Sequence, residues 1–358
     1  MTMFLIKKAD VGRIAQELGR EYRVYGPMIE KGSGQTFFDR ADNVADINLA
    51  APIPSNPPKS VVFPQMERIL AYEYDRSKNA VKMEPDYRIE PKALVGLRPC
   101  DLAGMLCLDR FFLGQEFVDE VYLNHRKKMF IVTNTCVTPF KQCFCVCTDS
   151  GPAATEGFDL NLTDLGDEYL VEAGSEKGAA FAAKLDLIPA NDSHLALKKE
   201  KVDKSISMFE DIAVDSKAWI SRVMNRVTTG FVKEDVWEYI GDQCFECGAC
   251  TFVCPSCSCF NIEDFNKPDT AVDRMREWDS CSFEGYTRMA GDHNPRKPIE
   301  DRRNKRFFCK LSYSQSKKYL RPGCVGCGRC AWVCPGDIGL PNVVTYVRRE
   351  ITEREINE

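Results

Sequence analysis

Short apolar runs between polar or turn residues recur in the first half of the chain. Residues 93–98 (ALVGLR), 129–135 (MFIVTNT) and 169–173 (YLVEA) are runs of this kind, and each is too short for a buried helix. We therefore predict three buried strands. Strands 93–98 and 129–135 are expected to be neighbours, which would place their carboxyl ends at one edge of a sheet.

Apolar residues at helical spacing alternate with these strands. The spacing predicts amphipathic helices over residues 8–20 and 64–74. A further helix is expected over residues 101–112, with Asp101 as its N-cap. The proline-rich stretch 51–58 is expected to form a loop or a surface arm.

Helical patterns dominate the second half. Apolar residues at near-helical spacing indicate a helical connector: Ile206, Phe209, Ile212, Trp219, Ile220, Val223, Val236, Trp237 and Ile240. Together the patterns predict an α+β protein with three parts. These are an α/β domain over residues 1–200, the helical connector over 201–240, and a mainly helical, ferredoxin-like domain over 241–358 with a charged tail.

The composition is that of a folded protein. Hydrophobic residues make up 44% of the 358 residues, and the net charge of −5 argues against a general nucleic-acid binder. No apolar run is long enough to span a bilayer, and the first residues, MTMFLIKKAD, lack the pattern of a secretory signal. We therefore expect a cytoplasmic protein without membrane insertion.

Cysteine is the most unusual feature of the composition. Six of the 18 cysteines lie between Cys100 and Cys147, and the other twelve lie between Cys244 and Cys334. The cytosol keeps thiols reduced, so a disulfide framework is not expected. Reduced thiols in such number are most simply explained as metal ligands, and the two groups indicate two metal-bearing regions.

The second group contains one motif twice. Two sets of four cysteines follow the pattern C-x2-C-x2-C-x3-C-P: Cys244, Cys247, Cys250 and Cys254, then Cys324, Cys327, Cys330 and Cys334. In ferredoxins with two [4Fe–4S] clusters, the fourth cysteine of each motif ligates the other cluster. This rule predicts two ligand sets: Cys244, Cys247, Cys250 and Cys334 for one cluster, and Cys324, Cys327, Cys330 and Cys254 for the other.

A pair of structural zinc sites is the alternative. Structural zinc takes its four ligands from two well-separated pairs, whereas each motif here offers three closely spaced cysteines and a fourth followed by proline. Gly248, Gly326 and Gly328 also remove side-chain bulk where backbone would approach inorganic sulfide. We therefore interpret the repeat as two [4Fe–4S] clusters.

The segment between the motifs, residues 255–323, is much longer than in a compact bacterial ferredoxin, and its helix-forming residues predict helices rather than a β-hairpin. Seven basic residues lie within 296–310, against Glu300 and Asp301. They could steer an acidic electron-transfer partner to the surface, or they could form an ordinary solvated helix face.

The first cysteine group suggests a third cluster. Cys100 and Cys136 follow two strands that are predicted to be neighbours, and Cys143 and Cys145 come soon after. Four thiols that converge from separate segments predict a further [4Fe–4S] site. Buried, inert cysteines are the alternative.

The remaining cysteines and the histidines show no ligand pattern. Two cysteines are expected to be structural: Cys107 and Cys147. Four others could form another metal site or shield the clusters: Cys257, Cys259, Cys281 and Cys309. The histidines are expected at the surface: His125, His194 and His293. Aromatic residues beside the motifs are expected to exclude water: Phe245, Phe252 and Trp332.

Further motifs give the chain a family resemblance. In the second half they are residues 278–281 (WDSC), 285–288 (GYTR), 290–296 (AGDHNPR) and 324–330 (CVGCGRC). In the first half they are residues 25–27 (YGP), 63–65 (FPQ), 96–101 (GLRPCD), 143–145 (CFC), 151–152 (GP), 157–159 (GFD) and 165–167 (LGD). Through these motifs nearly the whole chain resembles the β subunit of NAD(P)-linked [NiFe] hydrogenases, the sulfhydrogenases. It also resembles the corresponding electron-transfer subunit of anaerobic sulfite reductases.

The resemblance implies an electron-transfer subunit that lies between a flavin- and NAD(P)-binding subunit and a catalytic hydrogenase subunit. The alternative is the electron-input subunit of an anaerobic sulfite reductase, or of another flavin-linked complex like heterodisulfide reductase. A free-standing iron–sulfur enzyme is a third class. The sequence holds no G-x-G-x-x-G, no P-loop and no nucleophile–base pattern, so we expect substrate chemistry to belong to the partners.

Overall fold

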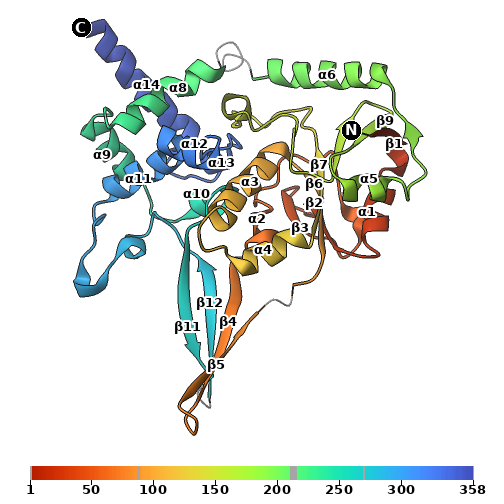
Figure 1. The fold of residues 1–358 in the computed structure, drawn as a ribbon. Helices are drawn as coiled ribbons and strands as arrows, with labels where there is room; N and C mark the ends of the chain where they lie inside the picture. The colour runs from red at the N-terminus through yellow and green to blue at the C-terminus, as the bar shows by residue number, and fades with distance from the viewer. Residues whose placement is uncertain (1, 87–88, 210–215, 269–270, 358) are drawn as a thin grey trace.

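Two β-sheets organise the chain. The computed structural model describes residues 2–86, 89–209, 216–268 and 271–357. In these residues an eight-stranded sheet, a four-stranded sheet and a helical region lie side by side (Figure 1). The mixture of helices and sheets agrees with the predicted α+β class. None of the described helices is long and apolar enough to cross a membrane.

The eight-stranded sheet forms the body of the N-terminal region. Its strands, in order across the sheet, are β10 (Ile188–Pro189), β1 (Met3–Lys7), β9 (Glu168–Ala173), β8 (Leu160–Asp164), β7 (Met129–Asn134), β6 (Lys92–Leu97), β2 (Arg23–Ile29) and β3 (Thr36–Arg40). The three predicted strands are confirmed as β6, β7 and β9. Strands β6 and β7 are parallel neighbours, as predicted, with Ala93 beside Phe130.

Helices cover both faces of this sheet, because its central strands carry apolar residues on both sides. In β6, Ala93 and Val95 belong to one core, whereas Leu94 and Leu97 belong to the other. The helices that complete the two cores are α1 (Gly12–Leu18) and α5 (Glu176–Ala182) on the first side, and α2 (Lys59–Val62), α3 (Pro99–Leu113) and α4 (Glu120–Lys127) on the second. In sheets covered in this way, ligands bind at the carboxyl ends of the strands.

Helix α3 confirms the helix predicted over residues 101–112, but its N-cap is Arg98, so the prediction of Asp101 as N-cap is wrong. Asp101 lies in the first turn, buried, where its carboxylate accepts two hydrogen bonds from Arg329. The loop predicted over residues 51–58 is present. It is not a surface arm, because Ala51 and Ile53 are buried.

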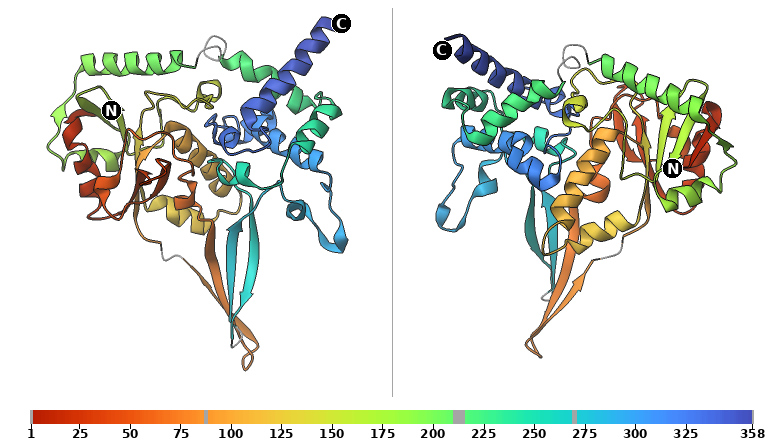
Figure 2. Two further views of the ribbon diagram at one scale, coloured as in Figure 1. Left: turned by 180° about the vertical axis from the view of Figure 1, so that it is seen from behind. Right: turned by 45° about the horizontal axis from the view of Figure 1, so that its top comes forward.

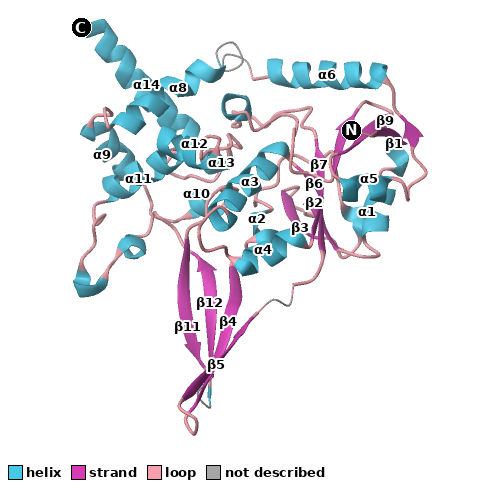
Figure 3. Ribbon diagram, viewed as in Figure 1, coloured by secondary structure: helices cyan, strands magenta, loops and turns pink. Residues whose placement is uncertain are grey.

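The four-stranded sheet projects from the body as an arm (Figures 1 and 2). Its antiparallel strands, in order, are β11 (Phe260–Asn266), β12 (Ala271–Trp278), β4 (Met66–Asp75) and β5 (Ala80–Pro85). The helix predicted over residues 64–74 is therefore wrong, and so is the helical prediction for residues 260–278 (Figure 3). Pairing between distant segments, such as Leu70 with Arg274, decides the structure here, and local propensity does not.

Helices fill the C-terminal region. They are α6 (Asp192–Ser207), α8 (Ser216–Thr229), α9 (Glu234–Asp242), α10 (Ala249–Phe252), α11 (Ile299–Leu311), α12 (Tyr313–Tyr319), α13 (Arg329–Trp332) and α14 (Leu340–Asn357). Most described residues of the predicted connector are thus helical, and Ile212 lies outside the described residues. Ile220 and Trp237 of the connector pack in one core with Phe307 of α11 and Val343 of α14.

The arm and the main core both join distant parts of the chain. The predicted limits at residues 200 and 241 place β4 and β5 in the first domain and β11 and β12 in the last, although the four strands form one sheet. The core that contains Trp237 also includes cysteines of both groups, among them Cys145 and Cys327. The two cysteine groups therefore lie close together in space.

Candidate functional site

The two cysteine motifs adopt the same local backbone. Gly248 and Gly328 each precede a one-turn helix, α10 or α13, and both have a left-handed φ, of 72° and 76°. Glu246 and Gly326 are also left-handed, with φ of 52° and 63°. This turn aims the Glu246 amide at the Cys244 sulfur, over 3.4 Å, and the Gly326 amide at the Cys324 sulfur, over 3.3 Å. Amide hydrogen bonds of this kind stabilise a negatively charged sulfur.

The structure brings together the first predicted ligand set. Four thiols line one small cavity: Cys244, Cys247, Cys250 and Cys334. Ser282 and Arg303 also line it, and the aromatic ring of Phe245 lies at its edge. The fourth cysteine of the second motif therefore lies with the first three of the first motif, which is the arrangement that the crossing rule predicts.

The second predicted set also converges. Burial, with the charge of Cys254 as a smaller cause, raises the pKa of three thiols: Cys324, Cys330 and Cys327, the last to about 12. Cys254 comes from the first motif and the other three from the second. Thiols that are this difficult to ionise in a buried site become thiolates when a metal shares their charge.

Neither set has the geometry of a single-ion site. In the described parts of the chain, no three Cys, His, Asp or Glu side chains meet closely enough to hold one metal ion. The thiolates of a [4Fe–4S] cluster instead stand around a cube, each at its own corner, and are correspondingly farther apart.

Buried cations surround the two sets. Residues 296–310 were expected either to dock a partner or to form a solvated face, and for helix α11 both expectations are wrong. Its basic residues Arg303, Arg306 and Lys310 are buried on the side that faces the thiols. Arg306 donates to the Cys250 carbonyl over 3.0 Å and lies 3.9 Å from the Cys257 sulfur. Lys310 donates to Ser256 over 2.9 Å.

Lys59, on α2, is a further buried cation that the sequence analysis did not single out. Its Nζ donates to the carbonyls of Thr251 and Cys257, over 3.2 and 3.1 Å, and lies 4.1 Å from the ring centre of Trp278. Burial lowers the pKa of Lys59 to about 8. No sequence motif marks this lysine, because only the fold brings α2 to the first cysteine motif.

The charges around the thiols fit iron–sulfur clusters. Within the described residues, no carboxylate forms an ion pair with any of four buried cations: Lys59, Arg303, Arg306 and Lys310. Burying unpaired cations costs several kcal/mol each. A [4Fe–4S] cluster with four thiolate ligands carries a net negative charge, which supplies the missing partner.

Removing one of these cations is expected to shift a cluster potential. In Arg306→Met the reduced state loses a stabilising positive charge, so the potential should fall by about 70–120 mV. The range follows from a unit charge at roughly 6–10 Å and an effective dielectric constant of about 20. Redox titration followed by EPR measures the shift. Arg274→Gln, on the arm, is the control and should leave the potential unchanged; an unchanged or higher potential in Arg306→Met would contradict the argument.

Four cysteines of the first group share another cavity. It lies where β6 and β7 end, and the thiols that line it are Cys100, Cys136, Cys143 and Cys145. The predicted convergence of these four side chains is therefore present. Cys107 and Cys147 are buried elsewhere and do not line this cavity.

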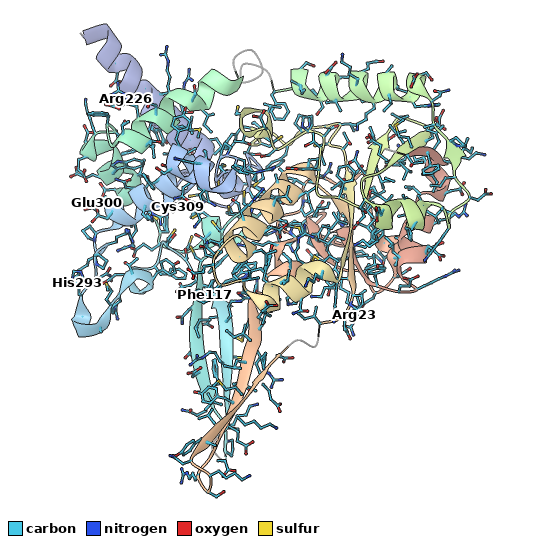
Figure 4. All side chains as sticks on the ribbon, in the orientation of Figure 1. Arg23, Phe117, Arg226, His293, Glu300 and Cys309 are labelled. Carbon is cyan, nitrogen blue, oxygen red and sulfur yellow. The ribbon has the colours of Figure 1, made fainter. Side chains whose placement is uncertain are left out.

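The other cysteines form pairs rather than a set of four. The thiol of Cys257 bonds with that of Cys254, and the thiol of Cys259 bonds with that of Cys281. Cys309 lies on α11 and is half-buried (Figure 4).

The histidine predictions are mixed. His125 was expected to be exposed, and this is wrong: it is buried, with Nε2 2.9 Å from Glu67, which also binds the buried Arg276. His194 is half-buried and caps α6. His293 is exposed, in a loop that extends from the helical region (Figure 4).

The aromatic neighbours differ in exposure. Phe252 packs against Trp278 and Phe283 and helps to cover the first motif. The rings of Phe245 and Trp332 are 69% and 40% exposed, so they only partly exclude water.

Paired cysteine loops of this geometry, with crossed fourth ligands, define a two-cluster iron–sulfur protein. Residues 243–338 match the 4Fe-4S dicluster domain family. The chain is 30% identical over 329 residues to the sulfhydrogenase 2 subunit beta of Pyrococcus furiosus, which covers 91% of this chain and 92% of that protein. The chain therefore belongs to the sulfhydrogenase beta-subunit family, and the resemblance inferred from its motifs is confirmed. No solved structure matches it.

Proposed function

We propose that this iron–sulfur subunit passes single electrons between a flavin- and NAD(P)-binding subunit and a catalytic hydrogenase subunit. Two [4Fe–4S] clusters would be held by the crossed thiol sets. The observation that supports this most directly is the placement of Cys334 in the cavity of Cys244, Cys247 and Cys250. When bound, such clusters accept and release one electron at a time.

The residues around the thiols favour a relay rather than a catalytic centre. The second set is buried in the main core, where Cys327 is 7% exposed. In the first set, by contrast, Cys247 is exposed, and the neighbouring Phe245 is exposed as well. The first set thus offers a contact surface to a partner, while the second is insulated from water.

The identity of the partners rests on the relative. A protein whose name includes sulfhydrogenase subunit beta works with other subunits, and we extend that arrangement to this chain. A sulfite reductase, or another flavin-linked complex, remains the competing assignment for the catalytic partner.

Anaerobic isolation of the native complex tests the proposal. Mass spectrometry of the co-purifying subunits is expected to find a flavoprotein and a nickel-binding subunit, and NAD(P)H should bleach the cluster absorbance of the complex. A sirohaem subunit would replace the hydrogenase assignment with sulfite reductase. A chain that purifies without redox partners and converts substrate alone would overturn the relay.

A further inference from the structure

We propose that Cys100, Cys136, Cys143 and Cys145 hold a third [4Fe–4S] cluster, which extends the relay proposed above beyond the second thiol set. The four residues come from three places: the first turn of α3, the segment after β7, and the short helix η3 (Cys145–Thr148) with the residues before it.

The cavity has the size and position of a ligand site. Its volume is about 430 Å³, whereas one water molecule takes about 30 Å³ of liquid volume, so it can hold a polyatomic group. It lies at the carboxyl ends of β6 and β7, where sheets of this kind bind ligands. Of the six cysteines in the first group, the four in the proposal line it.

The thiols lie close enough to influence one another electrostatically. The thiols of Cys143 and Cys145 are hydrogen-bonded to each other. The hydrogen bond from Cys143, burial, and then the charges of Cys100 and Cys136 raise the pKa of Cys145. Four thiols from three segments thus interact around one space, which a set of unrelated core cysteines has no reason to do.

Polar groups that line the cavity also point to a ligand. The Oδ1 atom of Asn134, which is 5% exposed, has no hydrogen-bond partner among the described residues, although its Nδ2 donates to Leu49 over 2.8 Å. A buried acceptor left in this way is costly. Arg98 also lines the cavity, where it donates to the Ala51 carbonyl and its charge lowers the pKa of Cys136 against the larger effect of burial. Its guanidinium would partly balance the negative charge of a cluster.

The second thiol set lies directly against this site. The Phe144 amide donates to the Gly326 carbonyl over 2.7 Å. A Cβ atom at Gly326 would lie 2.6 Å from the Cys145 backbone, and one at Gly328 would lie 2.5 Å from the Gln142 carbonyl, so these glycines allow the loops to touch.

A buried ion pair spans the same contact. The guanidinium of Arg329 binds both carboxylate oxygens of Asp101, over 2.5 and 2.8 Å. Asp101 follows Cys100, and Arg329 lies between Cys327 and Cys330. The three thiol sets therefore follow one another through the protein, with the second set in the middle. A transfer between adjacent sites would oxidise one cluster and reduce the next by one electron, without making or breaking a bond.

Iron analysis of the full chain tests the third site. Anaerobically prepared wild-type protein should contain about twelve iron and twelve acid-labile sulfide ions, and Cys136→Ser should contain about eight of each, with one fewer reducible centre by EPR. The matched controls Cys107→Ser and Cys147→Ser remove buried cysteines of the same group outside the cavity. They should retain about twelve.

The outcomes separate this inference from the relay itself. About eight iron ions in the wild-type chain would overturn the third site and leave the two-cluster relay intact, even if a variant fails to fold. A wild-type content of about twelve that persists in Cys136→Ser would place the additional cluster elsewhere and would also overturn the inference. Fewer than about eight ions in the wild type would contradict the proposed function instead.

Discussion

Replacing Cys254 with serine is expected to remove the cluster of the second motif, although Cys254 belongs to the first motif in sequence. The reason is its position beside three thiols of the second motif: Cys324, Cys327 and Cys330. Iron content should fall by about four ions per chain. Alkylation followed by mass spectrometry should then modify Cys324, while Cys244 stays protected.

The reciprocal change and a control complete this test. Cys334→Ser should expose Cys244 to alkylation and leave Cys324 protected, because Cys334 lies in the cavity of the first motif. Cys309→Ser removes a half-buried cysteine outside both sets and should retain its iron. If Cys254→Ser instead exposed Cys244, each motif would hold its own cluster and the crossed assignment would be wrong.

Loss of the carboxylate in Asp101→Ala is expected to destabilise the chain by about 3–5 kcal/mol, because it leaves Arg329 charged and unpaired in the interior. That is a large part of the roughly 5–15 kcal/mol that stabilises a typical domain. Anaerobic urea denaturation of the cluster-loaded protein measures the change.

Two comparisons show whether charge burial is the cause. Glu156→Ala breaks the exposed pair with Arg321 and should cost less than about 1 kcal/mol. The double variant Asp101→Leu, Arg329→Leu removes both charges and should recover much of the loss. A single Asp101→Ala variant as stable as Glu156→Ala would show that the pair carries little energy.

The local features of the sequence were sufficient for much of this structure. The buried strands β6, β7 and β9 were predictable because a short apolar run between turns has few other solutions. The convergence of eight cysteines was predictable because the motif fixes three ligands locally and the repeat supplies the fourth.

Features that depend on distant contacts were not predictable. Strand β4 contains residues that also suit a helix, and it becomes a strand because β12 and β5 pair with it. The basic residues of α11 have the composition of a solvated face, yet Arg306 and Lys310 are buried beside the thiols. Nothing in the sequence distinguishes a cation that faces water from one that faces a cluster. The same limit explains why Lys59 was missed and His125 was placed at the surface.

The buried cations also bear on the life of the subunit before it meets its partners. Without iron and sulfide, Lys59, Arg303, Arg306 and Lys310 would remain in an apolar interior with no opposite charge to balance them. Maturation and folding are thereby coupled: a chain that has not received its cofactors is electrostatically strained and open to proteolysis. Quality control of the assembled complex can thus begin inside this one polypeptide.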